Sequence, residues 1–129
     1  MSISESDLTD FDRWLREEFA RNGPFTALVV LVAFQGANVV PLCSTYLNVI
    51  GCEIDWGEIT VLFAASGADW HGASFFAAMA PEGGPLDNPS ARLKLQQLVD
   101  RVEGDRLVLN EGSFFDKWGR RVMIEEMMP

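Results

Sequence analysis

Histidine and cysteine are scarce in this chain, which has one histidine and two cysteines in 129 residues. Cys43, Cys52 and His71 supply at most three of the four soft ligands that a structural zinc site needs, and their spacing is not that of a zinc motif. No glycine-rich phosphate-binding motif of the P-loop or dinucleotide type is present. We therefore expect no metal site and no cofactor.

Basic residues are also few, because 10 Lys and Arg stand against 19 Asp and Glu, for a net charge of −9. Affinity for a phosphate backbone comes from neutralising phosphates with Lys and Arg, so we expect no direct binding to nucleic acid. The acidic surface would suit a basic protein partner or a mimic of DNA, although solubility alone explains the same charge. Arg13, Arg16 and Arg21 interrupt the acidic first helix and weaken the idea of a mimic.

Long hydrophobic runs are missing, since the longest apolar run ends at Gln35, short of the roughly 18 residues that a spanning helix needs. The N-terminal segment carries acids where a signal peptide would carry bases. We expect no membrane span, a cytoplasmic location, and reduced cysteines buried as core residues.

The chain is long enough to bury a core of its own, with 48% hydrophobic and 22% charged residues. We expect a single domain over residues 1–129, which a loop at residues 81–88, rich in proline and glycine, divides without separating two cores.

The organising segment lies between Asn22 and Cys52, where no Asp, Glu, Lys or Arg occurs. Its first part is apolar at both odd and even positions and rich in β-branched residues, which is typical of a strand covered on both faces. We predict that residues 27–34 form the central strand of a sheet.

Two amphipathic helices are predicted to cover this strand. The first begins at Ser4 or Ser6 and ends at Asn22, before Gly23 and Pro24. Its apolar stripe is Leu8, Phe11, Trp14, Leu15 and Phe19. The second is capped by Asn88, opens with Pro89 and ends at Gly104.

The remaining segments carry weaker patterns. A short uncharged helix is expected between Asn38 and Gly51, because Asn38 is a suitable cap and Pro41 would fall in the first turn. Residues 59–63 and 72–79 read as strands, but capping residues leave helices open as the alternative for 56–66 and 72–79. Short strands are expected at 106–109 and 120–125, with a single helical turn at 113–118 between them.

These elements predict an α+β fold, in which two main amphipathic helices pack on a mixed sheet of four to five strands within a single compact domain.

The only histidine lies in a turn that also contains a carboxylate and an aromatic residue. Asp69 could orient His71 as a general base, and Cys43 could complete a nucleophile pair if the fold brought it near. These three residues are our weak catalytic candidates. An exposed turn in which Asp69 caps the next segment explains the same residues without a reaction.

The only basic cluster is Lys117, Trp118, Arg120 and Arg121. Arginine with an aromatic neighbour can hold a carboxylate or phosphate, and tryptophan and arginine are the residue types that anchor protein interfaces. We predict an interface at these four residues, although a core tryptophan beside a solvated turn would give the same pattern.

The leading functional hypothesis is a non-catalytic acidic interaction module, an accessory or regulatory protein that binds a protein partner or itself as a homo-oligomer. The alternative is a small-molecule-binding protein or minor enzyme with a site around Asp69, His71 and Cys43.

Overall fold

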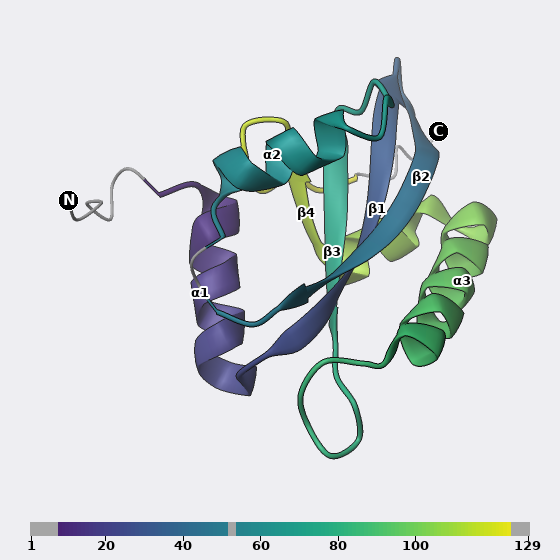
Figure 1. Cartoon of the computed structure of the whole chain (residues 1–129). Coiled ribbons are helices and arrows are strands. Elements are labelled where there is room, and N and C mark those ends of the chain that lie inside the picture. Colours follow the sequence, from purple (N-terminus) through teal and green to yellow (C-terminus); the bar gives the residue numbers. More distant parts are fainter. Residues whose placement is uncertain (1–7, 52–53, 125–129) are drawn as a thin grey trace.

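The computed structural model describes residues 8–51 and 54–124 of the chain (Figure 1). The elements, in chain order, are α1 (Asp10–Asn22), β1 (Phe25–Gln35), β2 (Asn38–Val49), α2 (Trp56–Ala64), β3 (Gly72–Ala78), α3 (Asn88–Gly104), a 3-10 helix η2 (Arg106–Glu111) and β4 (Ser113–Asp116). The four strands form one sheet in the order β2-β1-β3-β4, and every neighbouring pair is antiparallel. The predicted α+β class is confirmed, with antiparallel rather than mixed pairing and with no fifth strand in the described part of the chain.

Strand β1 lies inside the sheet and is buried on both faces, as its sequence predicts. Val29 and Leu31 point into a core cluster shared with α1 and α2. Val30 and Val32 point into a second cluster shared with α3 and η2. Helices α1 and α2 therefore cover one face of the sheet and α3 the other (Figure 1).

A buried carboxylate ties α1 to α2. Thr9 caps α1 by accepting a hydrogen bond from the Asp12 backbone N–H, and the Asp12 carboxylate accepts one from Thr9 in return. The same carboxylate accepts the backbone N–H of Trp56 at 2.9 Å. Helix α1 thus begins at Asp10, and the predicted start at Ser4 or Ser6 lies outside the described residues.

The predicted helix between Asn38 and Gly51 is wrong, because this segment is the long strand β2. It forms a hairpin with β1 through a tight turn at Gly36, whose φ of 61° favours glycine. The pairing shifts register by a bulge next to Pro41, which lies on an edge strand where the missing N–H is tolerated. Pairing with β1 along its whole length outweighs the local capping signal.

The predicted strand at residues 59–63 is also wrong, and the alternative helix is correct. Asp55 caps α2 by accepting the Glu58 N–H at 2.9 Å. Ile59 and Phe63 are buried four residues apart, on one face of a helix, whereas Val61 between them is 72% exposed. The strand predicted at 72–79 is confirmed as β3.

Three of the C-terminal assignments are wrong. Residues 106–109 belong to η2 rather than to a strand, and residues 113–116 form β4 rather than a helical turn. β4 pairs with the free edge of β3 and buries Phe114 and Phe115 on opposite faces of the sheet. The strand expected at 120–125 is reduced, within the residues described up to 124, to one bridge between Phe115 and Arg121.

Helix α3 begins one residue earlier than predicted. Asp87, not Asn88, is the cap, and its carboxylate accepts the Ser90 N–H at 2.8 Å. That hydrogen bond lowers the pKa of Asp87 below its ordinary value. Pro89 lies in the first turn, as expected.

We expect Gly112→Ala to destabilise the fold, because a Cβ at Gly112 would lie 2.6 Å from the carbonyl oxygen of Phe75. Relieving this overlap with backbone should cost roughly 1–3 kcal/mol in the free energy of unfolding, measured by urea denaturation. Gly104→Ala is the matched control, since a Cβ there meets no atom within 4 Å. Equal stability of the two variants would contradict the close packing of β4 against β3.

Candidate functional site

The basic cluster lies in a tight turn after β4, here named the Trp118 turn and comprising residues 116–121. The Asp116 carboxylate organises it, accepting the backbone N–H of Trp118 at 2.9 Å and that of Arg120 at 3.0 Å. The Arg120 guanidinium Nε donates a third hydrogen bond to it at 2.9 Å. Gly119 has a φ of 75°, which completes the turn. Three hydrogen bonds to one carboxylate therefore hold the backbone of the turn.

Segments distant in sequence clamp the Trp118 turn from outside. The indole N–H of Trp56 donates to the Lys117 carbonyl at 2.8 Å, and the Phe11 N–H donates to the Gly119 carbonyl at 3.0 Å. A Cβ at Gly119 would lie 2.9 Å from the Cβ of Thr9, so no larger residue fits there. The start of α1 and the start of α2 thus hold the turn in place.

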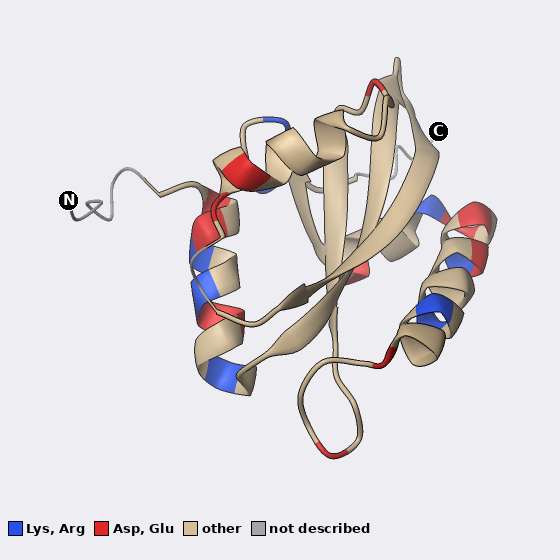
Figure 2. Cartoon of the chain, viewed as in Figure 1, with Lys and Arg blue, Asp and Glu red and all other residues tan. Residues whose placement is uncertain are grey.

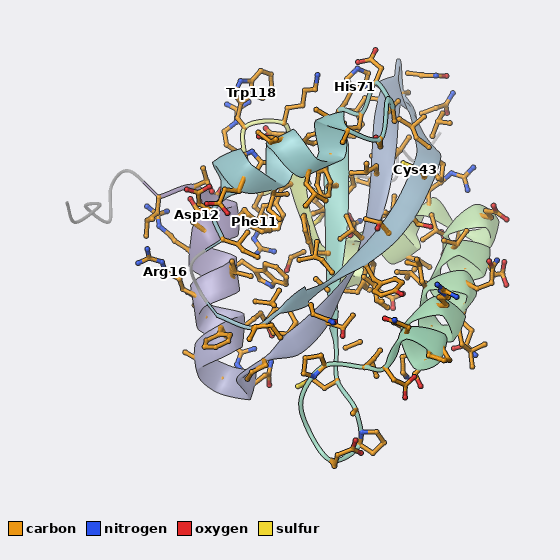
Figure 3. All side chains as sticks on the ribbon, viewed as in Figure 1. Phe11, Asp12, Arg16, Cys43, His71 and Trp118 are labelled. Atoms are coloured by element: carbon orange, nitrogen blue, oxygen red, sulfur yellow. The ribbon has the colours of Figure 1, made fainter. Side chains whose placement is uncertain are left out.

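The side chains of this clamped turn point into solvent. Trp118 is 67% exposed, and Figure 3 shows it at the outer end of the molecule, beyond α2. The Arg120 guanidinium carbon lies 5.0 Å from the centre of the Trp118 ring, a cation–π distance. Lys117 and Arg121 are exposed beside them. The structure thus places the four predicted interface residues on one small surface.

The charges of this surface are only partly compensated. Arg120 pairs with Asp116, whereas Lys117 and Arg121 form no ion pair within residues 8–51 and 54–124. The Arg121 side chain instead lies 5.2 Å above the ring of Phe115. An exposed indole ring flanked by cations suits a ligand that carries a carboxylate next to an apolar group.

Sequence reasoning missed the residues that build the turn, namely Asp116, Gly119 and Trp56. A local signal was available for two of them, because aspartate at the first position and glycine at the fourth are typical of a type I turn. No local signal identifies Trp56, whose contribution arises from a contact between distant segments.

The three catalytic candidates are not brought together. His71 uses its Nδ1 to accept the backbone N–H of Phe34 at 2.9 Å, and its ring stacks on that of Phe34. It thereby closes the end of the β1–β3 pairing, while Asp69 is exposed in the preceding loop. Cys43 lies on β2, across β1 from His71, so the two Cα atoms are at least about 10 Å apart (Figure 3).

Cys43 is exposed on β2, which corrects the prediction of a buried core thiol, whereas Cys52 lies outside the described residues. The hollow beside Cys43, between β2 and α3, has a volume of about 100 Å³. Ligand pockets usually measure about 300–1,000 Å³, so this hollow is too small for a substrate.

Among the residues described, no group of three or more His, Cys, Asp or Glu side chains could hold a metal ion. None of the helices within the described ranges is long and apolar enough to cross a membrane. Comparisons of the chain with protein-family models, with curated proteins and with solved structures find no match.

We expect Asp116→Ala to destabilise the protein by about 2 kcal/mol, because it removes the acceptor of three hydrogen bonds, one of them charge-assisted, at a site that is 7% exposed. Urea denaturation measures this change. Glu111→Ala is the control, since it breaks an exposed pair with Arg101 and should cost less than about 1 kcal/mol. Similar losses in the two variants would contradict the organising role of Asp116.

Proposed function

We propose that this protein is a non-catalytic interaction module that binds an acidic segment of a partner protein through the Trp118 turn. The observation that carries the proposal is that Trp118 is 67% exposed, with Arg120 stacked on it, although the backbone on both sides of it is held by hydrogen bonds from Trp56 and Phe11. Tryptophan and arginine are among the residue types that contribute most of the binding energy in protein interfaces.

The rigidity of the turn supports high affinity. Binding costs free energy for every side chain and loop that it must order, and the Trp118 turn is already ordered by Asp116, Trp56 and Phe11. Burying the exposed part of one indole ring would contribute roughly 3–4 kcal/mol. The part of this contribution that exceeds the cost of association lowers the dissociation constant, by tenfold for each ~1.4 kcal/mol.

The charges of the turn support an acidic rather than a basic contact. The cations of Lys117 and Arg121 have no partner acid within the described chain, and a carboxylate on the partner would supply one. Elsewhere, α1 and α3 each carry both acids and bases (Figure 2). The net charge of −9 disfavours unspecific binding to polyanions and leaves this small cluster as the specific positive contact.

We expect Trp118→Ala and Arg120→Ala each to weaken binding of the partner at least about tenfold, because each removes half of the stacked pair. The measurement starts with quantitative mass spectrometry of proteins retained by the wild type and by each variant in extracts of the source cells. A protein lost from both variants is then purified, and its affinity is determined by calorimetry.

Leu93→Ala is the matched control, because Leu93 is a comparably exposed apolar residue, at 60%, on α3 and outside the Trp118 turn. This variant should retain the same partner as the wild type. The proposal would be contradicted if the wild type, Trp118→Ala, Arg120→Ala and Leu93→Ala all retained the same proteins.

A further inference from the structure

The two outer edges of the sheet differ in whether another backbone segment hydrogen-bonds to them. At the β4 edge, the backbone of residues 120–122 returns alongside the strand. The Asp116 N–H donates to the Arg120 carbonyl at 2.9 Å, and the Val122 N–H donates to the Phe114 carbonyl at 2.9 Å. The β2 edge has no neighbouring strand in the described part of the chain, and in Figure 1 it lies in front of β1.

The hydrogen bonds around β1 reveal which groups of β2 face outward. On the β3 side, the Val32 carbonyl accepts the His71 N–H and the Phe34 N–H donates to His71, so even-numbered residues of β1 bond toward β3. Odd-numbered residues must then bond toward β2, because the groups of a strand alternate. Thr45, which is paired with Val29, therefore faces β1.

The backbone groups of Ser44, Tyr46 and Asn48 consequently point away from the sheet. The Tyr46 hydroxyl folds back to donate to the Asn88 side chain at 3.3 Å, toward the start of α3. The outward N–H and C=O groups of these three residues have no strand partner in the described residues, because β2 is at the edge of the sheet. An edge of this kind is a template for another strand.

Only half of the β2 edge is protected against such pairing. Beyond the bulge, Pro41 offers no N–H, and the outward Val39 carbonyl accepts a hydrogen bond from Arg106 Nε at 3.1 Å. Proline, a bulge and a covering charged side chain are devices by which proteins block open edges. Residues 43–49 contain none of these, and the ribbon of β1 and β2 has no red or blue segment in Figure 2.

We propose that residues 43–49 of β2 pair antiparallel with the same residues of a second copy of this chain. A twofold axis at Tyr46 would set Tyr46 opposite its own copy and Ser44 opposite Asn48. Each of the three pairs then joins residues whose backbone groups face outward and exchange hydrogen bonds. Such a dimer has one continuous sheet of eight strands.

A second copy is the occupant that we propose, because it brings the same open edge, whose outward-facing residues are placed symmetrically about Tyr46. Two copies with a net charge of −9 each repel one another through most of their surfaces. The strand between residues 43 and 49 has no charge, so it brings no like charges into contact across the interface. The Trp118 turn follows β4, at the opposite edge of the sheet, so a dimer would leave both turns free for the proposed partner.

Ser44→Pro tests the pairing directly. Its N–H faces outward, so proline removes hydrogen bonds to the second copy and none to β1. Ser44→Ala is the matched control, because it keeps the N–H. Sedimentation equilibrium of the full chain should show a dimer for the wild type and Ser44→Ala, and a dissociation constant raised at least about tenfold for Ser44→Pro.

The dependence of the dimer on salt concentration distinguishes this uncharged interface from one held by ion pairs. Raising the salt concentration should tighten or leave unchanged an uncharged contact between two acidic copies, because it screens their repulsion. A dimer held by acids of α1 against Arg120 and Arg121 would instead weaken. That result, or loss of the dimer in Trp118→Ala with Ser44→Pro unaffected, would overturn the edge pairing and leave the Trp118 turn as a contact surface.

Amide exchange of the wild type provides a second measurement that does not depend on whether Ser44→Pro folds. The N–H groups of Ser44, Tyr46 and Asn48 should become protected as the protein concentration rises, while that of Thr45 stays protected throughout. A wild type that is monomeric at all concentrations, with rapid exchange at these three positions, would overturn the proposal. Either outcome leaves the test of the Trp118 turn unaffected.

Discussion

Burial of β1 on both faces is the constraint on which the rest of the structure depends. A strand with apolar residues at both odd and even positions needs a layer on each side, since either uncovered face would leave several large side chains in water. Helices α1 and α2 supply one layer, and α3 with η2 supplies the other. The only polar side chain in the buried part of β1, Thr26, donates to Asn48 and accepts from Leu86, so it is fully paired.

The core also positions the candidate site. The Trp56 ring packs in the cluster of α1 and α2, between Phe11 and Trp70, while its indole N–H reaches the Lys117 carbonyl. One residue thus belongs both to the core and to the frame of the Trp118 turn. Because Trp56 is fixed in the core and bonds to the backbone of the turn, the turn keeps its position and Trp118 remains exposed to solvent.

The open edge of β2 follows from the same constraint. β1 needs a partner strand on each side, and β2 provides one of them along its whole length. β2 has no strand on its other side in the described part of the chain, so it is an edge strand of the sheet. Half of this edge carries blocking features, and the uncharged half is where a second copy of the chain would add the next strand.

The sequence by itself determined the charge balance, the apolar segment that becomes β1, and the helices α1 and α3, because composition and amphipathic spacing are local properties. It also located the basic cluster, since Lys117, Trp118, Arg120 and Arg121 are neighbours in the chain. It misassigned β2, because capping signals at Asn38 suggested a helix and pairing with β1 was invisible from local pattern.

Only the tertiary structure decided that Trp118 is exposed and that distant residues hold its turn in place. The local sequence does not distinguish a buried tryptophan from an exposed one. The exposure of Trp118 depends on how its turn is held, through hydrogen bonds from Phe11 and Trp56, which lie far away along the chain. The separation of Cys43 from His71 was likewise decided by the strand order, which places β1 between them. The physical reason is the same in each case, because long-range pairing sets which local elements meet and which of their side chains remain in water.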